Sequence, residues 1–370
     1  MQHVVHYKGQ YDKTLLFAIL MLLVISVVMV YSSSSVVALT TYDDSSFFMK
    51  RQLLWVAAGL VLLTLTMRID HRRLSDQRVV LTVMAVSFIL LALTLFPGIG
   101  RMVNGSRRWL RLGMMSFQPA ELAKFAIVVY MSYYVAKKGE RIRDFMNGMV
   151  PAYVVTAVFL SLAVLQPDFG SAMTLACVAG IMLFAGGANI LHIGGTLLAA
   201  LPLIIFAVAH KAYRWRRIVA FLDPWSDPQG AGHQIIQSFL AFGSGGLFGR
   251  GLGEGRQKLL FLPERHSDFI YAVIGEELGL IGALAVMLLY LIILWRGVRI
   301  SLAVGDPFSK LLALGITLLI CLQGLINMAV VTGILPTKGI ALPLVSYGGS
   351  SIVITMGALG VLLNISKETE

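Results

Sequence analysis

Long apolar segments recur along the whole 370-residue chain and restrict it to a membrane fold. These segments are continuously apolar, as spanning helices are, and lack the alternation of apolar and polar residues that an outer-membrane barrel shows. Composition agrees: 57% of the residues are hydrophobic, only 13% are charged and the mean hydropathy is +0.81. We therefore expect an all-α, polytopic integral membrane protein that forms one membrane domain over residues 1–370.

Ten apolar segments are long enough to cross a bilayer, at about 20 residues per crossing. The first apolar run, Thr14–Tyr31, is too long for a signal-peptide core, so we expect it to be retained as an anchor. An even number of crossings places both ends of the chain on one side. The expected helices lie near residues 14–35, 52–67, 79–97, 117–136, 149–165, 169–187, 190–209, 270–294, 309–331 and 347–364.

Lysine and arginine in the short loops set the orientation, because cytoplasmic loops carry an excess of both. The basic residues of alternate loops predict that these loops and both termini are cytoplasmic, and that loop 210–269 lies outside. These residues are Lys8, Lys13, Arg68, Arg72, Arg73, Arg78, Lys137, Lys138, Arg141, Arg143, Arg296, Arg299 and Lys310.

Two strongly basic segments fall on the outer side, against this rule: loop 98–116 and residues 210–217. Either the helix count is wrong by one, or the arginines bind lipid headgroups, or they bind another anion. Guanidinium groups pair with phosphate oxygens and tryptophan anchors at the interface, so a pyrophosphate at the membrane surface fits both segments. The candidates are Arg107 and Arg108 beside Trp109, and Arg214, Arg216 and Arg217 around Trp215.

A net charge of +11 also raises the question of nucleic-acid binding. The basic residues, however, are scattered over loops on both faces of a membrane. We expect no nucleic acid among the partners.

Loop 210–269 is too long for a simple connector. Its segment His233–Phe242 has apolar residues at helical spacing and is predicted to lie in the membrane interface. The next segment, Gly243–Gly255, is rich in glycine, but neither a preceding strand nor a closing Gly-Lys-Ser/Thr supports a phosphate loop. A turn that lets the backbone approach a substrate is the favoured interpretation.

Three further clusters carry polar groups into apolar sequence. Glu121 and Lys124 are spaced i, i+3 within an expected helix, so they form either a neutralised structural pair or part of a wet cavity. Asp168, in QPDFG, is expected to cap the next helix, with catalysis as the alternative. In segment 332–351, prolines, glycines and Lys338 interrupt an apolar sequence, and Gly348 to Ser351, including Ser350, offer backbone donors to an anion.

Asp268 ends the segment FLPERHSDF (Phe261–Phe269), where the aqueous loop meets the bilayer surface. A carboxylate there can accept a proton from the hydroxyl of a lipid-linked substrate, or it can simply cap the helix that follows. The residues alone favour capping. Two cysteines, Cys177 and Cys321, lie far apart within apolar helices, so neither a disulfide framework nor a metal site is indicated.

Taken together, these segments resemble the SEDS family (shape, elongation, division and sporulation) over essentially the whole chain. The matching motifs are NGSRRWLRLG, FQPAELAK, QPDFGSA, LDPWSDPQGAGHQIIQS, GSGGLFGRGLGEGRQK, LPERHSDFIYAVIGEELGL and LPLVSYGGSS. Segment VVTGILPTKG, with Thr337-Lys338-Gly339, looks more like a division or sporulation member than an elongation member.

The resemblance implies a ten-helix peptidoglycan glycosyltransferase that polymerises lipid II in the bacterial cytoplasmic membrane. It would join the 4-hydroxyl of one GlcNAc to the anomeric carbon of a MurNAc carried on undecaprenyl diphosphate. Asp268 matches the family's essential aspartate. Glu264 is an alternative proton acceptor or a loop anchor, and His266 either tunes these carboxylates or hydrogen-bonds the loop. The arginines, Glu121, Lys124, Lys338 and Ser350 are further candidates for substrate contact.

The resemblance also implies a class B penicillin-binding protein as partner, together with divisome or elongasome regulators and membrane lipids. A divalent cation, Mg²⁺ or Mn²⁺, could bridge Asp268 to the diphosphate, although no dedicated ligand motif is present. Two other classes of function stay open. One is a lipid II flippase, which Glu121, Lys124 and the broken segment 332–351 would suit, and the other is a scaffold that recruits a transpeptidase.

Overall fold

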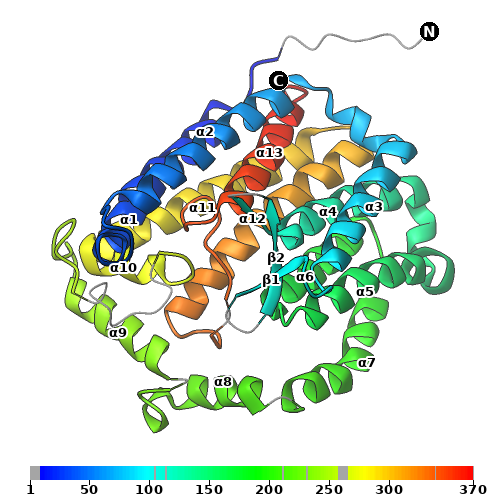
Figure 1. Cartoon of the computed structure of the whole chain (residues 1–370). Coiled ribbons are helices and arrows are strands. Elements are labelled where there is room, and N and C mark those ends of the chain that lie inside the picture. The colour runs from blue at the N-terminus through cyan, green and yellow to red at the C-terminus, as the bar shows by residue number, and fades with distance from the viewer. Residues whose placement is uncertain are drawn as a thin grey trace.

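The computed structural model describes residues 9–103, 106–112, 115–210, 212–230, 232–256, 266–337 and 339–369. Helices make up most of it (Figure 1). They are α1 (Lys13–Tyr42), α2 (Phe47–Arg68), α3 (Gln77–Leu93), α4 (Pro119–Lys138), α5 (Val150–Leu165), α6 (Phe169–Ala185), α7 (Ile190–Ala209), α8 (Ala212–Leu222), α9 (His233–Gly245), α10 (Ile270–Glu277), α11 (Gly279–Ala303), α12 (Pro307–Val331) and α13 (Gly349–Ser366). Short helical turns are η1 (His71–Ser75), η2 (Gly139–Arg143), η3 (Phe145–Met149) and η4 (Pro224–Ser226).

The apolar helices are those of a multi-span membrane protein. Within the described residues, six are long and apolar enough to cross a bilayer: Lys13–Tyr42, Phe47–Arg68, Phe145–Leu165, Gly279–Ala303, Pro307–Val331 and Gly349–Ser366. Shorter apolar helices are Gln77–Leu93, Phe169–Ala185 and Ile190–Leu203. Several helices begin where an aspartate or asparagine accepts a hydrogen bond from the first turn, as Asp12 does for α1 and Asp306 for α12.

The centre of the bundle is formed by α12 and α13. Their most apolar stretches are 67% and 78% buried, against 22% for α2, so they lie inside the bundle while α2 borders the lipid. Helix α12 packs against α4, α6 and α11, and α13 packs along α2 (Figure 1). Polar side chains on α12 are therefore enclosed by protein, where each needs a hydrogen-bond partner.

Helices α7, α8 and α9 run along one edge of the bundle (Figure 1). None of the α7 side chains that the structure describes is buried, and leucines such as Leu191, Leu198 and Leu203 are highly exposed. In a bilayer, this apolar surface faces hydrocarbon. Loop 210–269 contains α8, η4 and α9, and α9 confirms the helical spacing predicted for His233–Phe242.

The all-α prediction is wrong in loop 98–116, which forms a three-stranded antiparallel sheet. Strand β2 (Ser106–Leu112) lies between β1 (Gly100–Val103) and β3 (Met115–Phe117). Side chains alternate between the two faces of a strand. Leu110 is buried and the adjacent Arg111 is exposed, as this geometry requires, but SRRWLRL as a whole shows no regular alternation, because three polar residues precede the adjacent apolar Trp109 and Leu110.

The predicted single helix 270–294 is also wrong, because the chain breaks into α10 and α11 at Gly279. Gly279 has φ +69°, and a Cβ atom there would clash with the backbone nitrogen of Gly249. The glycine turn 246–251 docks onto this break through backbone hydrogen bonds, among them Leu280 N to Gly246 O at 2.9 Å and Gly251 N to Glu277 O at 3.0 Å. The glycines thus allow two backbone segments to meet.

Candidate active site

Asp268 is half-buried in a turn immediately before α10, and its backbone is held by a residue of α12. The Asn327 side chain donates from Nδ2 to the Asp268 carbonyl oxygen at 2.7 Å and to the Ile340 carbonyl oxygen at 2.6 Å. A Cβ atom on Gly339 would lie 3.0 Å from Asp268 Oδ2, so the carboxylate rests against the Gly339 backbone. The turn that carries Asp268 therefore lies next to the segment after α12, where prolines and glycines interrupt the apolar sequence.

The QPDFG turn approaches the same place. A Cβ atom on Gly170 would lie 2.5 Å from Ile340 Cγ1 and 3.4 Å from Gly339 O, so the start of α6 is in contact with this segment. Asp168, only 2% exposed, accepts from Ser171 N at 3.1 Å and Ser171 Oγ at 2.8 Å, which confirms the predicted cap. Three segments distant in sequence thus meet at one end of the bundle.

Arg108 of β2 is directed at the QPDFG turn. Its Nε donates to Gln166 O at 3.0 Å and its Nη2 to Pro167 O at 2.5 Å, while Nη1 lies 3.9 Å from Asp168 Oδ1. These contacts bring a cation to the edge of the site and use much of its donor capacity. Arg107 is adjacent on β2, and strand alternation directs it to the opposite face. The two predicted anion-binding arginines therefore do not form one pair.

Helix α8 supplies the other arginines. The Arg214 guanidinium lies over the Phe169 ring, 3.9 Å from its centroid, and Arg217 Nη1 donates to Thr337 O at 3.4 Å. These two residues are spaced i, i+3, so they share the helix face that turns toward the QPDFG turn and Thr337. Arg216 and Arg217 are both exposed, but helical spacing places Arg216 on a different face. Arg214 and Arg217 thus border the same region as Arg108.

The predicted pair in α4 is present and buried, with Glu121 8% and Lys124 3% exposed. Lys124 Nζ lies 2.7 Å from Glu121 Oε1 and donates to Gln323 Oε1 at 2.6 Å. Gln323 donates in turn to Ala341 O at 3.1 Å, and Ser351 Oγ donates to Glu121 Oε2 at 3.2 Å. The pair is therefore linked through α12 to the segment that contacts Asp268.

His266 and Ser350 have packing contacts of their own. The His266 ring packs on Phe48 at 5.0 Å and on Tyr347 at 5.7 Å between centroids. Burial raises the pKa of Tyr347 and so further disfavours ionisation of its phenol. Ser350 Oγ accepts from Gln118 N at 3.1 Å and donates to Ser116 O at 3.3 Å, which ties α13 to β3 and the start of α4. Glu264 and Lys338 lie outside the described residues.

Several site residues were not predicted from the sequence. Asn327 and Gln323 are polar residues one turn apart in an apolar helix, a signal that points to an enclosed partner. Glu276 and Glu277, at most 1% exposed, end α10. Glu276 accepts from Arg256 N at 2.7 Å and Glu277 accepts from Ser32 Oγ at 2.6 Å. Both carboxylates thus hold segments that lead into the site.

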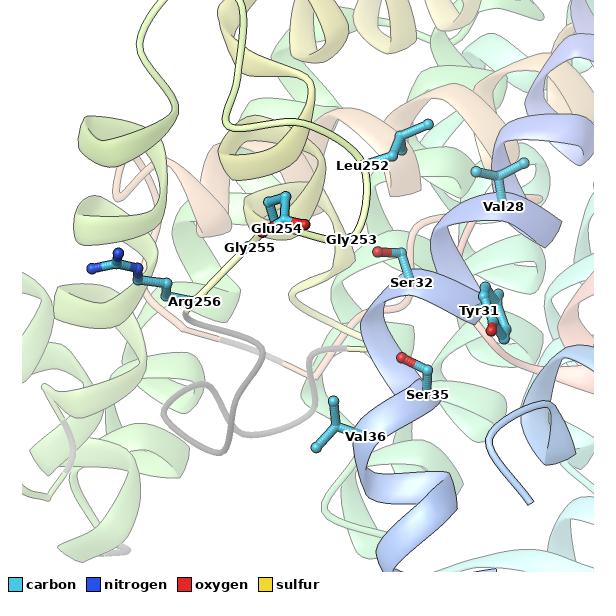
Figure 2. Close-up of a pocket in the computed structure, with 10 residues that line it drawn as sticks. All are labelled: Val28, Tyr31, Ser32, Ser35, Val36, Leu252, Gly253, Glu254, Gly255 and Arg256. Carbon is cyan, nitrogen blue, oxygen red and sulfur yellow. The ribbon is translucent and has the colours of Figure 1, made fainter. Parts of the chain in front are cut away.

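A cavity of about 540 Å³ adjoins this second set of contacts, between α1 and residues 252–256. Figure 2 shows Ser32 and Ser35 of α1 pointing toward the turn at Gly253, while Arg256 points away from α1. Its lining is mixed, because α1 contributes Val28 and Tyr31 beside Ser32 and Ser35. The α1 wall of the cavity therefore carries both polar and apolar side chains.

No group of three or more His, Cys, Asp or Glu side chains suited to a metal ion occurs among the residues that the structure describes. Asp168 is committed to its cap, and the Asp268 carboxylate faces Gly339. Of these two carboxylates, Asp268 is therefore the one that could contribute to holding a cation.

Comparison with known proteins identifies the family. The family model described as cell cycle protein (FtsW, RodA and SpoVE) matches residues 13–370. The chain is 50% identical over 317 residues to the probable peptidoglycan glycosyltransferase FtsW of Trichlorobacter lovleyi, covering 86% of this chain and 83% of that protein. It is 43% identical over 319 residues to the stage V sporulation protein E of Bacillus subtilis, covering 86% of each.

Solved structures share the fold. A chain from a peptidoglycan synthase complex, described for its coordination of polymerization and crosslinking, aligns with a TM-score of 0.78 at 30% identity, covering 97% of this chain and 98% of that one. The rod shape determining protein RodA of Thermus thermophilus aligns with a TM-score of 0.71 at 26% identity, covering 97% of each chain. The chain therefore belongs to the FtsW, RodA and SpoVE family of cell cycle proteins, the family expected from its sequence motifs.

Proposed function

We propose that this protein is a peptidoglycan glycosyltransferase of the division type that polymerises lipid II into β-1,4 glycan strands. The observation that carries the proposal is the meeting of the Asp268 turn, the QPDFG turn, Thr337 and segment 339–341 beside Arg108, Arg214 and Arg217. It brings the Asp268 carboxylate and several cations to one end of an apolar bundle, and these are the groups that glycosyl transfer from a diphosphate needs. The family relationship supports the same activity.

In this reaction, Asp268 accepts the proton of the GlcNAc 4-hydroxyl on one lipid II molecule. The freed oxygen forms a bond to the anomeric carbon of MurNAc on a second molecule. The bond between that carbon and the undecaprenyl diphosphate oxygen breaks, and the lipid diphosphate leaves with the electron pair. Arg214 and Arg217 are placed to stabilise the charge that develops on the diphosphate.

A ten-crossing topology accommodates this chemistry. The six long apolar helices, the three shorter apolar ones and α4 together make ten, with α8, α9 and α10 outside the count. Asp12 N donates to Ser366 Oγ at 3.0 Å, so the first and last crossings meet at the same end of the bundle. We infer that both termini are cytoplasmic and that the Asp268 site lies at the outer face of the bacterial cytoplasmic membrane, within a single membrane domain.

A class B penicillin-binding protein is the proposed partner, because a structural relative comes from a peptidoglycan synthase complex that couples polymerization to crosslinking. Divisome regulators and membrane lipids complete the set of partners. A divalent cation, if bound, would be held by Asp268 and would supply positive charge to stabilise the departing diphosphate. Chelation followed by Mg²⁺ or Mn²⁺ addition measures whether the reaction requires one.

The test is polymerisation by the purified protein in liposomes, with lipid II and no other polymerase. We expect glycan strands from the wild type and none from Asp268→Asn. Asp306→Asn is the matched control, because asparagine also caps helices and Asp306 lies at the start of α12. Near-normal glycan synthesis by Asp268→Asn would rule out the proposed role of Asp268 in proton transfer. Translocation of fluorescent lipid II without polymerisation would identify a flippase, and neither activity would identify a scaffold.

A further inference from the structure

Asn327 lies in the last part of α12 and is only 1% exposed. Its side-chain amide has two hydrogens, and both are used: one for the Asp268 carbonyl and one for the Ile340 carbonyl, at 2.7 and 2.6 Å. The two acceptors are separated by more than seventy positions in sequence and join the site from different segments. A single NH₂ group therefore connects the two chain segments that flank the Asp268 carboxylate.

The connection controls where the carboxylate lies. Gly339, adjacent to Ile340, forms the surface against which Asp268 Oδ2 rests. Neighbouring contacts hold other residues of the turn: Ser346 Oγ donates to Ser267 O at 2.5 Å, and Tyr347 N donates to His266 O at 2.9 Å. Asn327 is thus the described side chain that holds the backbone of Asp268 itself.

The oxygen of the same side-chain amide makes no corresponding hydrogen bond to the described residues. Asn327 Oδ1 is buried and has no hydrogen-bond partner in the part of the chain that the structure describes. An unpaired buried acceptor is unfavourable for stability. The benefit of asparagine at this position therefore comes from its two donors.

We propose that Asn327 is a positioning residue for glycosyl transfer, which fixes the Asp268 turn against segment 339–341 by its two hydrogen bonds. The proposal rests on the catalytic role of Asp268 proposed above. Displacement of a reacting group by about 1 Å can reduce a rate roughly 100-fold, so loss of this contact should act on the chemical step more than on substrate binding. Gln323, one turn earlier, holds Ala341 by the same kind of contact.

The experiment measures initial rates of lipid II polymerisation by the full chain in detergent, together with thermal stability. Asn327→Leu removes the donors, and Asn364→Leu is the matched control. Asn364 Nδ2 donates to Met67 O at 2.9 Å, and Asn364 Oδ1 accepts from His71 N at 3.2 Å, so it also joins two segments, at the other end of the bundle. We expect both variants to have a lower Tm than the wild type. Only Asn327→Leu should lose kcat, by roughly 10- to 100-fold, with KM for lipid II changed less than about threefold.

Wild-type kcat in Asn327→Leu would overturn the proposal, as would equal losses of kcat in the two variants, since these would mean a structural role alone. If Asn327→Leu is not recovered folded, Asn327→Gln provides the measurement. It keeps the NH₂ group but displaces it by one methylene, so a lower kcat at constant KM supports positioning and an unchanged kcat contradicts it. If Asp268→Asn still polymerises lipid II, the proposed catalytic role of Asp268 fails, and this result is distinct from the outcomes for Asn327.

Discussion

The buried pair in α4 predicts an unequal response to the loss of either partner. Lys124→Met leaves the Glu121 carboxylate, 8% exposed, with the hydrogen bond from the Ser351 hydroxyl at 3.2 Å as its remaining polar contact among the described residues. Removing one member of a buried ion pair costs about 3–5 kcal/mol, because the other charge is left uncompensated. Glu121→Gln should cost less, since Lys124 keeps Gln323 Oε1 at 2.6 Å and gains the new amide oxygen.

The double variant Glu121→Gln with Lys124→Met removes both charges. We expect its loss of stability to be smaller than the sum of the two single losses by about 2–3 kcal/mol. Thermal unfolding in detergent ranks the four proteins, and lipid II polymerisation is measured on the folded fraction. We expect the double variant to recover folding but not full activity, because Gln323 loses Lys124 while it still contacts Ala341.

A surface pair is the control for this cycle. Lys50 Nζ and Asp44 Oδ2 lie 2.8 Å apart, almost the same separation as in the buried pair, but the two side chains are 64% and 36% exposed. Breaking it should leave Tm nearly unchanged. The reasoning is refuted if both single variants of the buried pair behave like the wild type. Full recovery of both folding and activity in the double variant would show that the pair is only structural.

Two further predictions concern the arginines and the helix break. The double variant Arg214→Gln with Arg217→Gln should raise KM for lipid II, whereas the matched control Arg216→Gln, at an exposed position on a different face, should change it little. Equal KM values for the double variant and the control would exclude a selective anion site on this face of α8. Gly279→Ala should destabilise the protein by at least about 1–2 kcal/mol, from its φ of +69° and the clash with Gly249. Gly194→Ala, with nothing within 4 Å of the added carbon, should be neutral or stabilising, and unfolding measurements that rank the two the other way would contradict this account of the break.

The sequence by itself determined the membrane class, the approximate positions of the apolar helices and the chemistry-bearing motifs. These properties are local: an apolar run of sufficient length spans a bilayer, and Asp168 before Ser171 caps a helix, whatever the rest of the chain does. The i, i+3 spacing likewise brought Glu121 and Lys124 together before any packing was known. The sheet in loop 98–116 was harder to predict, since SRRWLRL places three polar residues before the adjacent apolar Trp109 and Leu110 and so lacks a period of two.

Only the tertiary structure decided which of these motifs share a site. Whether Arg108 meets the QPDFG turn and whether Asn327 reaches Asp268 depend on how β2 and α12 pack against segments far away in the chain. The break at Gly279 has the same origin, because it is favourable only when the glycine turn 246–251 supplies partners for the exposed backbone. Local pattern carries no information on such contacts, since the free energy that fixes them comes from burial and hydrogen bonds between segments distant in sequence.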